Sequence, residues 1–241
     1  MGGYVDIHSH ILYGVDDGSQ SLEESVQMLS MAYEEGVRVM YVTPHYGSGK
    51  EKYNSDSLVE KFNELSGVAK GIGDEGIKLI LGNEITYSSS AVEDLKCGKA
   101  RTMGDTRYVL LEFDYEVSFK EMYKGLSAII NAGYRPILAH IERYYCLNKN
   151  YNDILSLREL GVALQINTSS VMTKFSAEAK FCRKLIREGY IHFLGSDCHR
   201  VKWRAPLMKQ AVEVIKKKTP ERYLERILFT NPERLQNNQF L

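Results

Sequence analysis

Short apolar runs alternate with amphipathic segments along this chain. The apolar runs are rich in Val, Ile and Leu, which is typical of strands buried on both faces. They cover residues 4–8, 37–43, 77–82, 108–113, 136–140, 162–166 and 192–195. Between them apolar side chains recur at helical spacing, as Leu22, Val26 and Leu29 do, and predict helices. The predicted helices cover residues 21–35, 55–70, 119–132, 151–160 and 177–188.

The order of these elements predicts an α/β fold built from seven strand–helix units. Regular alternation of strands and helices implies a parallel sheet covered by helices. No Pro-, Gly- or Ser-rich linker divides residues 1–241, so we expect a single domain. Its last part, residues 219–241, should form two short helices that begin at Pro220 and Pro232. A closed or nearly closed barrel is the favoured architecture, and a doubly wound open sheet is the alternative.

Composition narrows the classes of function. Lys and Arg together number 31, as do Asp and Glu, so the neutral chain gives no support for nucleic-acid or membrane binding. No apolar run approaches the roughly 20 residues that span a bilayer, and no secretion signal is visible. The cysteines lack paired spacing, which favours a reduced, cytoplasmic setting. They are Cys97, Cys146, Cys182 and Cys198.

Histidines and acids follow six of the seven predicted strands, at the point where the strand ends, and the sixth strand ends at Asn167. His8 and His10 alternate at the end of the first strand and therefore face the same way. Asp16 and Asp17 lie in the next loop, and either could contribute a ligand. The other strand ends carry His45, Glu84, Glu112, His140, Asp197 and His199.

This pattern predicts a multinuclear metal site. In a parallel barrel the carboxyl ends of all strands meet at one face, where active sites are built. Nitrogen and carboxylate ligands without thiolate suit Zn, Mn or Fe, and closely spaced ions stabilise phosphoryl-transfer transition states. A single histidine would not decide the matter, but the joint pattern does. We expect Asp6 to orient His8, Asn167 to line the pocket without binding metal, and His192 to be structural.

Two arginines closely follow the ligand motifs. Arg143 comes three residues after His140, and Arg204 comes five residues after His199. A guanidinium can bind phosphate through two parallel hydrogen bonds, so we expect both arginines to bind the phosphate of a substrate.

Cys198 and Arg204 also form C-x5-R, the skeleton of thiol-dependent tyrosine phosphatases. The loop between them contains no glycine, so its backbone N–H groups cannot easily turn onto a phosphate. The carboxylate of Asp197 would raise the thiol pKa rather than lower it. We therefore favour metal chemistry over a cysteine nucleophile.

The motifs resemble those of the PHP (polymerase and histidinol phosphatase) superfamily, and within it the CpsB/YwqE-type protein-tyrosine phosphatases of bacterial capsule and exopolysaccharide loci. The resemblance spans essentially the whole chain. The matching pieces are D-I-H-S-H-I-L-Y-G-V-D-D-G at 6–18, T-P-H at 43–45, G-N-E-I at 82–85, L-L-E-F at 110–113, A-H-I-E-R-Y at 139–144 and S-D-C-H at 196–199. Tyr46 and Ile141 depart from residues that some members have, but neither is a ligand in the pattern.

The resemblance implies a distorted (β/α)7 barrel with three divalent ions, manganese in the active form, with iron or zinc as alternatives. Arg143 and Arg204 match the phosphate-binding arginines of the family. The implied ligands are His8, His10, Glu84 and Asp197 for the first ion, Glu84, Glu112 and His140 for the second, and Asp17, His45 and His199 for the third.

The implied activity is hydrolysis of phosphotyrosine by a hydroxide held between the metals. The implied substrate is the tyrosine-rich tail of a bacterial tyrosine autokinase. Alternatives are a small-molecule phosphatase acting on histidinol phosphate or another metal-dependent phosphoesterase such as a nuclease. An amidohydrolase would usually have eight units and often a bridging lysine, which the sequence lacks, and a non-enzymatic barrel would have lost ligands. The oligomeric state stays open.

Overall fold

The computed structural model describes residues 3–173 and 176–241, and every strand pair in this part of the chain is parallel. One sheet has the order β1-β2-β4 and the other has the order β3-β5-β6-β7-β8-β9. The strands are β1 (Tyr4–Asp6), β2 (Val37–Val42), β3 (His45–Tyr46), β4 (Lys78–Leu81), β5 (Glu84–Thr86), β6 (Tyr108–Glu112), β7 (Arg135–Leu138), β8 (Ala163–Asn167) and β9 (Phe193–Gly195). The predicted α/β class with a parallel sheet is confirmed, since each of the predicted apolar runs overlaps a strand.

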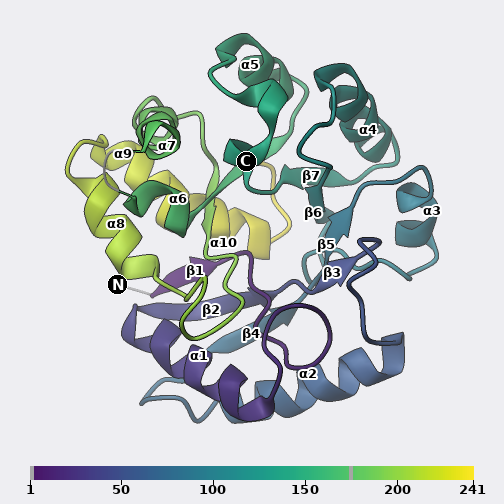
Figure 1. Ribbon diagram of the computed structural model, residues 1–241, viewed down its shortest axis with the longest axis vertical. Helices are drawn as coiled ribbons and strands as arrows, with labels where there is room; N and C mark the ends of the chain where they lie inside the picture. Colours follow the sequence, from purple (N-terminus) through teal and green to yellow (C-terminus); the bar gives the residue numbers. More distant parts are fainter. Residues whose placement is uncertain (1–2, 174–175) are drawn as a thin grey trace.

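Helices surround the strands in Figure 1. The helices are α1 (Leu22–Glu34), α2 (Ser55–Ala69), α3 (Ala91–Lys96), α4 (Phe119–Asn131), α5 (Tyr151–Glu159), α6 (Thr168–Met172), α7 (Ala177–Arg187), α8 (Met208–Lys216), α9 (Glu221–Glu225) and α10 (Asn231–Gln236). Short 3-10 turns, η1 (Ile141–Arg143) and η2 (Tyr145–Leu147), follow β7. The sequence analysis did not predict α3, α6 and α8, of which α3 and α6 are only one or two turns long.

The two sheets continue into one another. Chain that leaves β2 passes through Pro44 into β3, and chain that leaves β4 passes through Gly82 into β5. Hydrogen bonds from Gly82 N to Val42 O (2.9 Å) and from Glu84 N to Pro44 O (3.1 Å) bridge the interruption. Proline cannot donate a ladder hydrogen bond, which helps to explain why the strand breaks there.

The far edges of the sheets also meet. Ser9, beyond β1, forms a parallel bridge with Cys198, beyond β9. His10 N donates to Cys198 O at 2.9 Å, and Asp197 N donates to His8 O at 2.8 Å. The sheet is therefore curled, and the segments that follow its first and last strands meet where His8 and Asp197 stand.

Alternate residues of the strands separate two apolar layers. Leu110 and its neighbours on other strands form a cluster inside the curled sheet, whereas Val109 and Leu111 pack in the layer that includes the surrounding helices. The inner cluster is Ile7, Tyr41, Met103, Tyr108, Leu110, Ile137, Ala139, Ala163, Phe193 and Leu235. An enclosed apolar interior is a property of barrels, so the alternative of a flat, doubly wound sheet is not what the structure shows.

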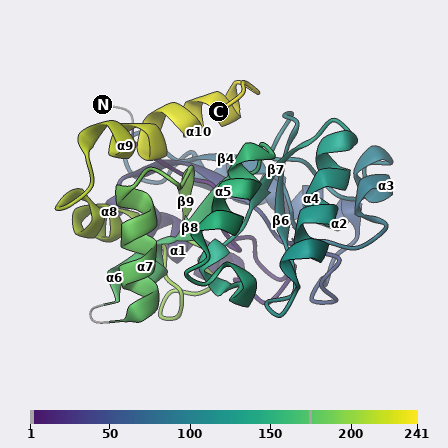
Figure 2. The ribbon, with the colours of Figure 1, turned by 90° about the horizontal axis from the view of Figure 1, so that it is seen from above.

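Helices α9 and α10 lie at one end of the molecule together with the C-terminus (Figure 2). The two helices expected in this region are present, but they are joined by a π-helical turn, η3 (Arg226–Thr230), and the second begins at Asn231. Leu235 of α10 is fully buried in the inner cluster and so covers that end of it. Within the described residues, no helix is both long and apolar enough to cross a membrane.

Candidate metal centre

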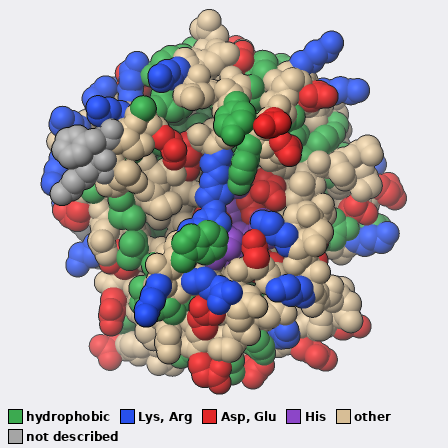
Figure 3. Space-filling model, in the orientation of Figure 1, with side chains coloured by type: hydrophobic (Ala, Val, Ile, Leu, Met, Phe, Trp, Pro, Cys, Tyr) green, Lys and Arg blue, Asp and Glu red, His purple; other side chains and the backbone are tan. Residues whose placement is uncertain are grey.

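The carboxyl ends of the strands bring all the predicted metal ligands to one place. Glu84, which follows β4 and begins β5, lies at the centre of this cluster and is 1% exposed. Its Oε1 lies 2.8 Å from His140 Nε2 and 3.3 Å from His8 Nε2, and its Oε2 lies 3.1 Å from His10 Nε2. In Figure 3 histidine side chains are visible in the middle of this face, between acidic and basic side chains.

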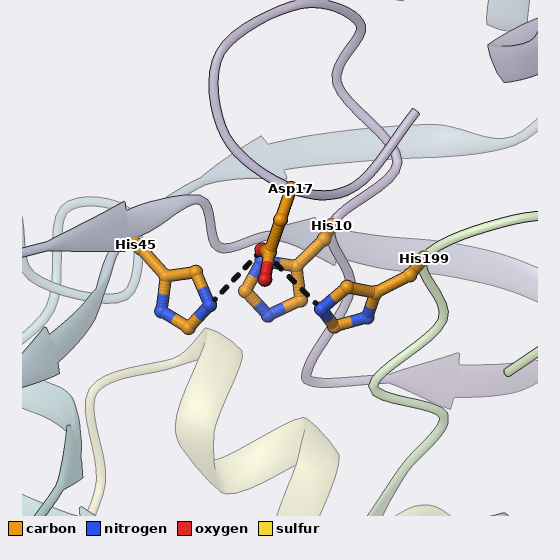
Figure 4. Close-up of side chains that lie close together, drawn as sticks. All are labelled: His10, Asp17, His45 and His199. Atoms are coloured by element: carbon orange, nitrogen blue, oxygen red, sulfur yellow. Dashed lines mark ion pairs between the residues drawn. The ribbon is translucent and has the colours of Figure 1, made fainter. Parts of the chain in front are cut away.

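Three groups within the cluster have ligand atoms close enough to share an ion. Figure 4 shows the largest group, in which Asp17 Oδ1 lies 3.3 Å from His45 Nε2 and 3.6 Å from His199 Nε2. In each group the ligand atoms lie within 4.8 Å of one another. The groups are His10, Asp17, His45 and His199; His8, His10 and Glu84; and His45, Glu84 and Glu112.

These groups overlap more than the implied ligand sets do. His10 takes part in two of them, and His45 lies 3.1 Å from Glu84 Oε2 as well as near Asp17. His140 lies 3.7 Å from Glu112 Oε2 in addition to its close contact with Glu84. The structure therefore brings together every predicted ligand, as one continuous cluster rather than as three separate sets.

The two neighbouring aspartates of the loop after β1 have different surroundings. Asp16 is fully buried and its Oδ2 accepts from His10 Nδ1 at 2.8 Å, so it holds the ring from behind. Asp17 faces His45 and His199 (Figure 4). Gly18 permits this turn, because a Cβ there would lie 2.1 Å from His10 O. Of the two alternatives left open by the sequence, Asp17 is the one placed among the ligands.

The expectation for Asp6 was wrong in detail. Asp6 Oδ1 accepts from the backbone N–H groups of His8 (3.3 Å) and Ser196 (2.8 Å), so it ties β1 to β9 rather than orienting an imidazole. Burial raises the pKa of Asp6 to about 6. The ring of His8 instead faces Gln165, whose Oε1 lies 3.4 Å from Nδ1. The sequence analysis missed Gln165, although its inward position in the motif before Asn167 could have indicated it.

Three of the site residues have left-handed backbone conformations. The φ angles are 33° for His140, 51° for Asp197 and 54° for Arg204. Such angles are uncommon outside glycine and cost free energy, and they tend to occur where function requires a particular side-chain direction. Each strand end therefore turns sharply where its ligand or arginine leaves the sheet.

The electrostatics of the cluster fit metal binding. Burial alone would raise the pKa of Glu84, but His8, His10 and His140 hold it well below its usual range. Burial would likewise raise the pKa of Asp197, which His8 and His10 lower. Both carboxylates are thus charged acceptors.

Some buried nitrogen and oxygen atoms of the cluster also lack hydrogen-bond partners among the described residues. They are Asp17 Oδ1, His45 Nδ1 and His140 Nδ1. Buried polar atoms are normally paired, so these atoms call for a further partner. The donor set of imidazole nitrogens and carboxylate oxygens suits divalent ions such as Mn, Fe and Zn.

Both predicted arginines reach the same carboxylate oxygen. Arg143 Nη2 lies 2.8 Å from Asp197 Oδ2, and Arg204 Nη2 contacts that oxygen as well. Asn167 Nδ2 donates to it at 2.7 Å, so Asn167 lies directly beside the cluster. The other oxygen, Oδ1, faces His8 and His10 at 3.6 and 3.4 Å. Asp197 thus presents one oxygen to the histidines and the other to the arginines.

Lys50 is a functional candidate that the sequence analysis missed. Its Nζ lies 3.0 Å from Asp17 Oδ2 and 3.1 Å from His45 Nε2. Burial would lower the pKa of Lys50, but Asp17 raises it. A lone lysine in the Gly-Ser-Gly-Lys loop carries no motif, so the sequence offered no signal for it.

The surroundings of Cys198 and His192 differ from those of the ligand residues. Cys198 is fully buried in the outer apolar layer, and burial raises the pKa of its thiol to about 12, which disfavours a thiolate nucleophile. His192 stands before β9, away from the cluster, and its Nδ1 accepts from Leu164 N at 3.0 Å. It therefore supports the backbone.

Fold and site together define a class: a metal-dependent hydrolase whose buried cluster of imidazoles and carboxylates lies at one rim of a curled parallel sheet covered by helices. The family model described as capsular polysaccharide synthesis, CpsB/CapC, matches residues 4–237. The chain belongs to this family.

Relatives and solved structures agree with that assignment. The tyrosine-protein phosphatase CpsB of Streptococcus pneumoniae is 34% identical over 98% of this chain and all of its own length. The tyrosine-protein phosphatase YwqE of Bacillus subtilis is 31% identical over 98% of this chain and 92% of its own. A crystal structure from work on YwqE and CpsB, described as metal-dependent tyrosine phosphatases, superposes with a TM-score of 0.88 at 30% identity, and covers 98% of this chain and 95% of that one.

A more distant structure shares the fold alone. The phosphotriesterase homology protein from Escherichia coli, with phosphate in its active site, superposes with a TM-score of 0.60 at 14% identity, and covers 97% of this chain and 98% of its own. The expected resemblance to CpsB/YwqE-type phosphatases is therefore confirmed by the family model, by the relatives and by the solved structure.

Proposed function

We propose that this chain is a metal-dependent protein-tyrosine phosphatase of bacterial capsule or exopolysaccharide synthesis. The observation that carries the proposal is the pair of arginines, Arg143 and Arg204, that converge on Asp197 beside a buried cluster of metal-type ligands. Relatives that align over nearly the whole chain are named tyrosine-protein phosphatases, which supports the same reaction.

The proposed cofactor is a set of three divalent ions, with manganese favoured and iron or zinc as alternatives. The first ion would be held by His8, His10, Glu84 and Asp197, the second by Glu84, Glu112 and His140, and the third by Asp17, His45 and His199. The overlap of the groups supports shared ligands, because one carboxylate can bridge two ions. When bound, such ions lower the pKa of water for attack on phosphorus and offset the charge of the phosphate.

The arginines would bind the phosphate. A phosphate dianion that enters the site can replace Asp197 Oδ2 as the acceptor for Arg143 and Arg204, while Asn167 continues to hold Asp197 at 2.7 Å. Lys50, half exposed at the rim, adds a further positive charge. The tyrosine leaves as a phenolate whose conjugate acid has a pKa of about 10, so it needs little help from a strong acid.

The proposed architecture is a distorted seven-stranded (β/α) barrel that forms a single domain of residues 1–241. Continuity of β2 with β3 and of β4 with β5 supports seven strand positions, and the bridge from Ser9 to Cys198 supports closure. Leu235 of α10 and Ile7, directly after β1, belong to the same buried cluster, which supports a single domain because it joins the last helix to the start of the chain's fold.

The proposed substrate is a phosphotyrosine protein, the tyrosine-rich tail of a bacterial tyrosine kinase, and the proposed location is the cytoplasm. The balanced charge of the chain supports a protein rather than a nucleic acid as partner. The names of the relatives support the link with capsule synthesis.

The test is hydrolysis by metal-stripped protein with and without added Mn, Fe or Zn, on a phosphotyrosine peptide and on histidinol phosphate. We expect no turnover without metal, and after addition of Mn a higher kcat/KM for the peptide than for histidinol phosphate. A preference for histidinol phosphate would replace the proposal with a small-molecule phosphatase.

A further inference from the structure

Exposed aromatic side chains gather around the metal cluster. Among the described residues, six large hydrophobic side chains are exposed, and Tyr115 (41%), Tyr145 (69%) and Trp203 (58%) all lie near the two site arginines. Figure 3 shows hydrophobic side chains beside the central histidines on this face. Single exposed apolar residues need no explanation, but several around one polar site indicate a binding surface.

Each site arginine has its own aromatic partner. Arg143 Nη1 donates to Tyr115 Oη at 3.3 Å, and the guanidinium carbon of Arg204 lies 5.2 Å from the centre of the Trp203 ring. The two pairs meet at Asp197, where both arginines contact Oδ2. An anion held by the two arginines therefore lies close to both aromatic rings.

The aromatic rings stand on different sides of the cluster. Tyr115 is edge-on to the ring of His140, with centroids 6.1 Å apart, and Trp203 is edge-on to the ring of His199, with centroids 5.4 Å apart. His8 and His10 link those two histidines through neighbouring rings. The substituent of a bound phosphate thus has an aromatic surface available on either side.

A cavity beside Arg143 extends the aromatic surface. It has a volume of about 320 Å³, and Tyr115, Tyr144 and Tyr145 contribute to its lining. Tyr145 N donates to Tyr115 O at 3.1 Å, so the backbone holds these two residues together. The cavity offers room for peptide next to the phosphorylated side chain.

We propose that Tyr115 and Trp203 are specificity-determining residues that contact the phenyl ring of a phosphotyrosine side chain while Arg143 and Arg204 bind its phosphate. This inference rests on the proposed phosphatase function and deepens it. Aromatic pairs prefer edge-to-face or offset contacts and stabilise binding beyond the area that they bury. An alkyl phosphate would make the same arginine contacts but not the aromatic ones.

The alternative is that Tyr115 and Trp203 only cover the ligand histidines and keep solvent away from them. Shielding would act equally on every phosphate ester, whereas ring contact would favour aryl over alkyl compounds. The two roles are therefore separated by a ratio of affinities rather than by activity alone.

The affinities of phenylphosphonate and methylphosphonate give that ratio. Neither compound is hydrolysed as a phosphate ester, and only phenylphosphonate carries an aromatic ring. Trp203 is the only tryptophan of the chain, so its fluorescence reports directly on a ring bound beside it. With Mn-loaded protein, we expect phenylphosphonate to change this fluorescence and to bind more tightly than methylphosphonate. The same protein is assayed for hydrolysis of a phosphotyrosine peptide.

The variants are Trp203→Leu and Tyr115→Leu, with inhibition constants measured for both phosphonates. Each should reduce the preference for phenylphosphonate roughly 3- to 10-fold, the size expected for one aromatic contact, with little change for methylphosphonate. Tyr115→Phe keeps the ring and should retain the preference. Tyr123→Leu removes an exposed aromatic side chain from α4 and serves as the matched control.

The outcomes separate the two proposals. Suppose that wild type hydrolyses the phosphotyrosine peptide but that Trp203→Leu and Tyr115→Leu weaken the binding of both phosphonates equally, or of neither. The ring contact is then refuted and the phosphatase function stands. If wild type neither hydrolyses the peptide nor binds either phosphonate, both proposals fall. A loss confined to phenylphosphonate supports the ring contact.

Discussion

Asp16 Oδ2 accepts a hydrogen bond from His10 Nδ1 at 2.8 Å. Asp16, one of the two aspartates that the sequence offered as ligands, therefore lies behind the ligand His10. The opposite ring nitrogen, His10 Nε2, faces Glu84 at 3.1 Å and Asp197 at 3.4 Å. Burial would lower the pKa of His10, but Asp16 raises it well above its usual value. This pairing fixes the direction in which His10 presents its free nitrogen.

The two aspartates should therefore differ in their effect on metal binding. We expect Asp17→Asn to lower the number of bound ions by one, because it removes a ligand. Asp16→Asn should keep the full number at saturation but weaken affinity roughly 10- to 100-fold, the usual effect of losing a residue that orients a ligand. Elemental analysis after dialysis, with a competitive chelator titration, measures both. Loss of an ion in Asp16→Asn alone would reverse the assignment.

Removal of either site arginine should weaken catalysis without emptying the metal site. Arg143→Ala or Arg204→Ala should lower kcat/KM for a phosphotyrosine peptide. The loss should correspond to roughly 2–5 kcal/mol of transition-state stabilisation, as for other desolvated charge pairs. Asn167 still holds Asp197, so metal content should be unchanged. Arg200→Ala is the matched control, since Arg200 pairs with Glu24 at 3.2 Å instead. Wild-type kinetics in both site variants would show that the arginines do not bind phosphate.

Catalysis should depend on metal and not on Cys198. The buried thiol, with its pKa raised to about 12, is a poor nucleophile. We expect Cys198→Ala to retain most activity, whereas His199→Ala abolishes it. A chelator should inactivate the wild-type protein, added Mn should restore activity, and a thiol-alkylating reagent should do little. Loss of activity in Cys198→Ala together with indifference to chelation would falsify the metal mechanism.

His192 should make stability depend on pH. Burial, with help from Arg158 and Arg226, lowers the pKa of His192 to about 3, and protonation of Nδ1 would break the hydrogen bond from Leu164 N. The unfolded chain binds this proton at about pH 6.5, so the folded state loses stability as pH falls from about 6.5 towards 3. The loss approaches about 1.4 kcal/mol per pH unit for one proton.

Urea unfolding of wild type and His192→Asn between pH 7 and pH 4 isolates this effect. The asparagine oxygen can still accept from Leu164 N but does not titrate. Because the other histidines are unchanged, the difference in the pH slope of the free energy of unfolding belongs to His192. Equal slopes in the two proteins would show that His192 titrates normally.

The sequence determined the element types and the set of candidate ligands. Six of the seven predicted apolar strands stop at His, Glu or Asp. This pattern can be read locally, because parallel strands end at one face and carry those side chains there. Every residue predicted in this way, from His8 to His199, lies in the cluster. The dismissal of Cys198 also came from local chemistry, and its complete burial agrees with it.

Only the tertiary structure decided which atoms meet. Asp16 and Asp17 are adjacent in sequence and chemically identical, and the turn at Gly18 sends one behind His10 and the other towards His45. Lys50 reaches the cluster from a loop without any sequence motif, and Gln165 reaches it from β8, where only its position two residues before Asn167 was a signal. Such contacts depend on how distant segments pack and on backbone angles such as φ 51° at Asp197, and neither is encoded in the spacing of residues along the chain.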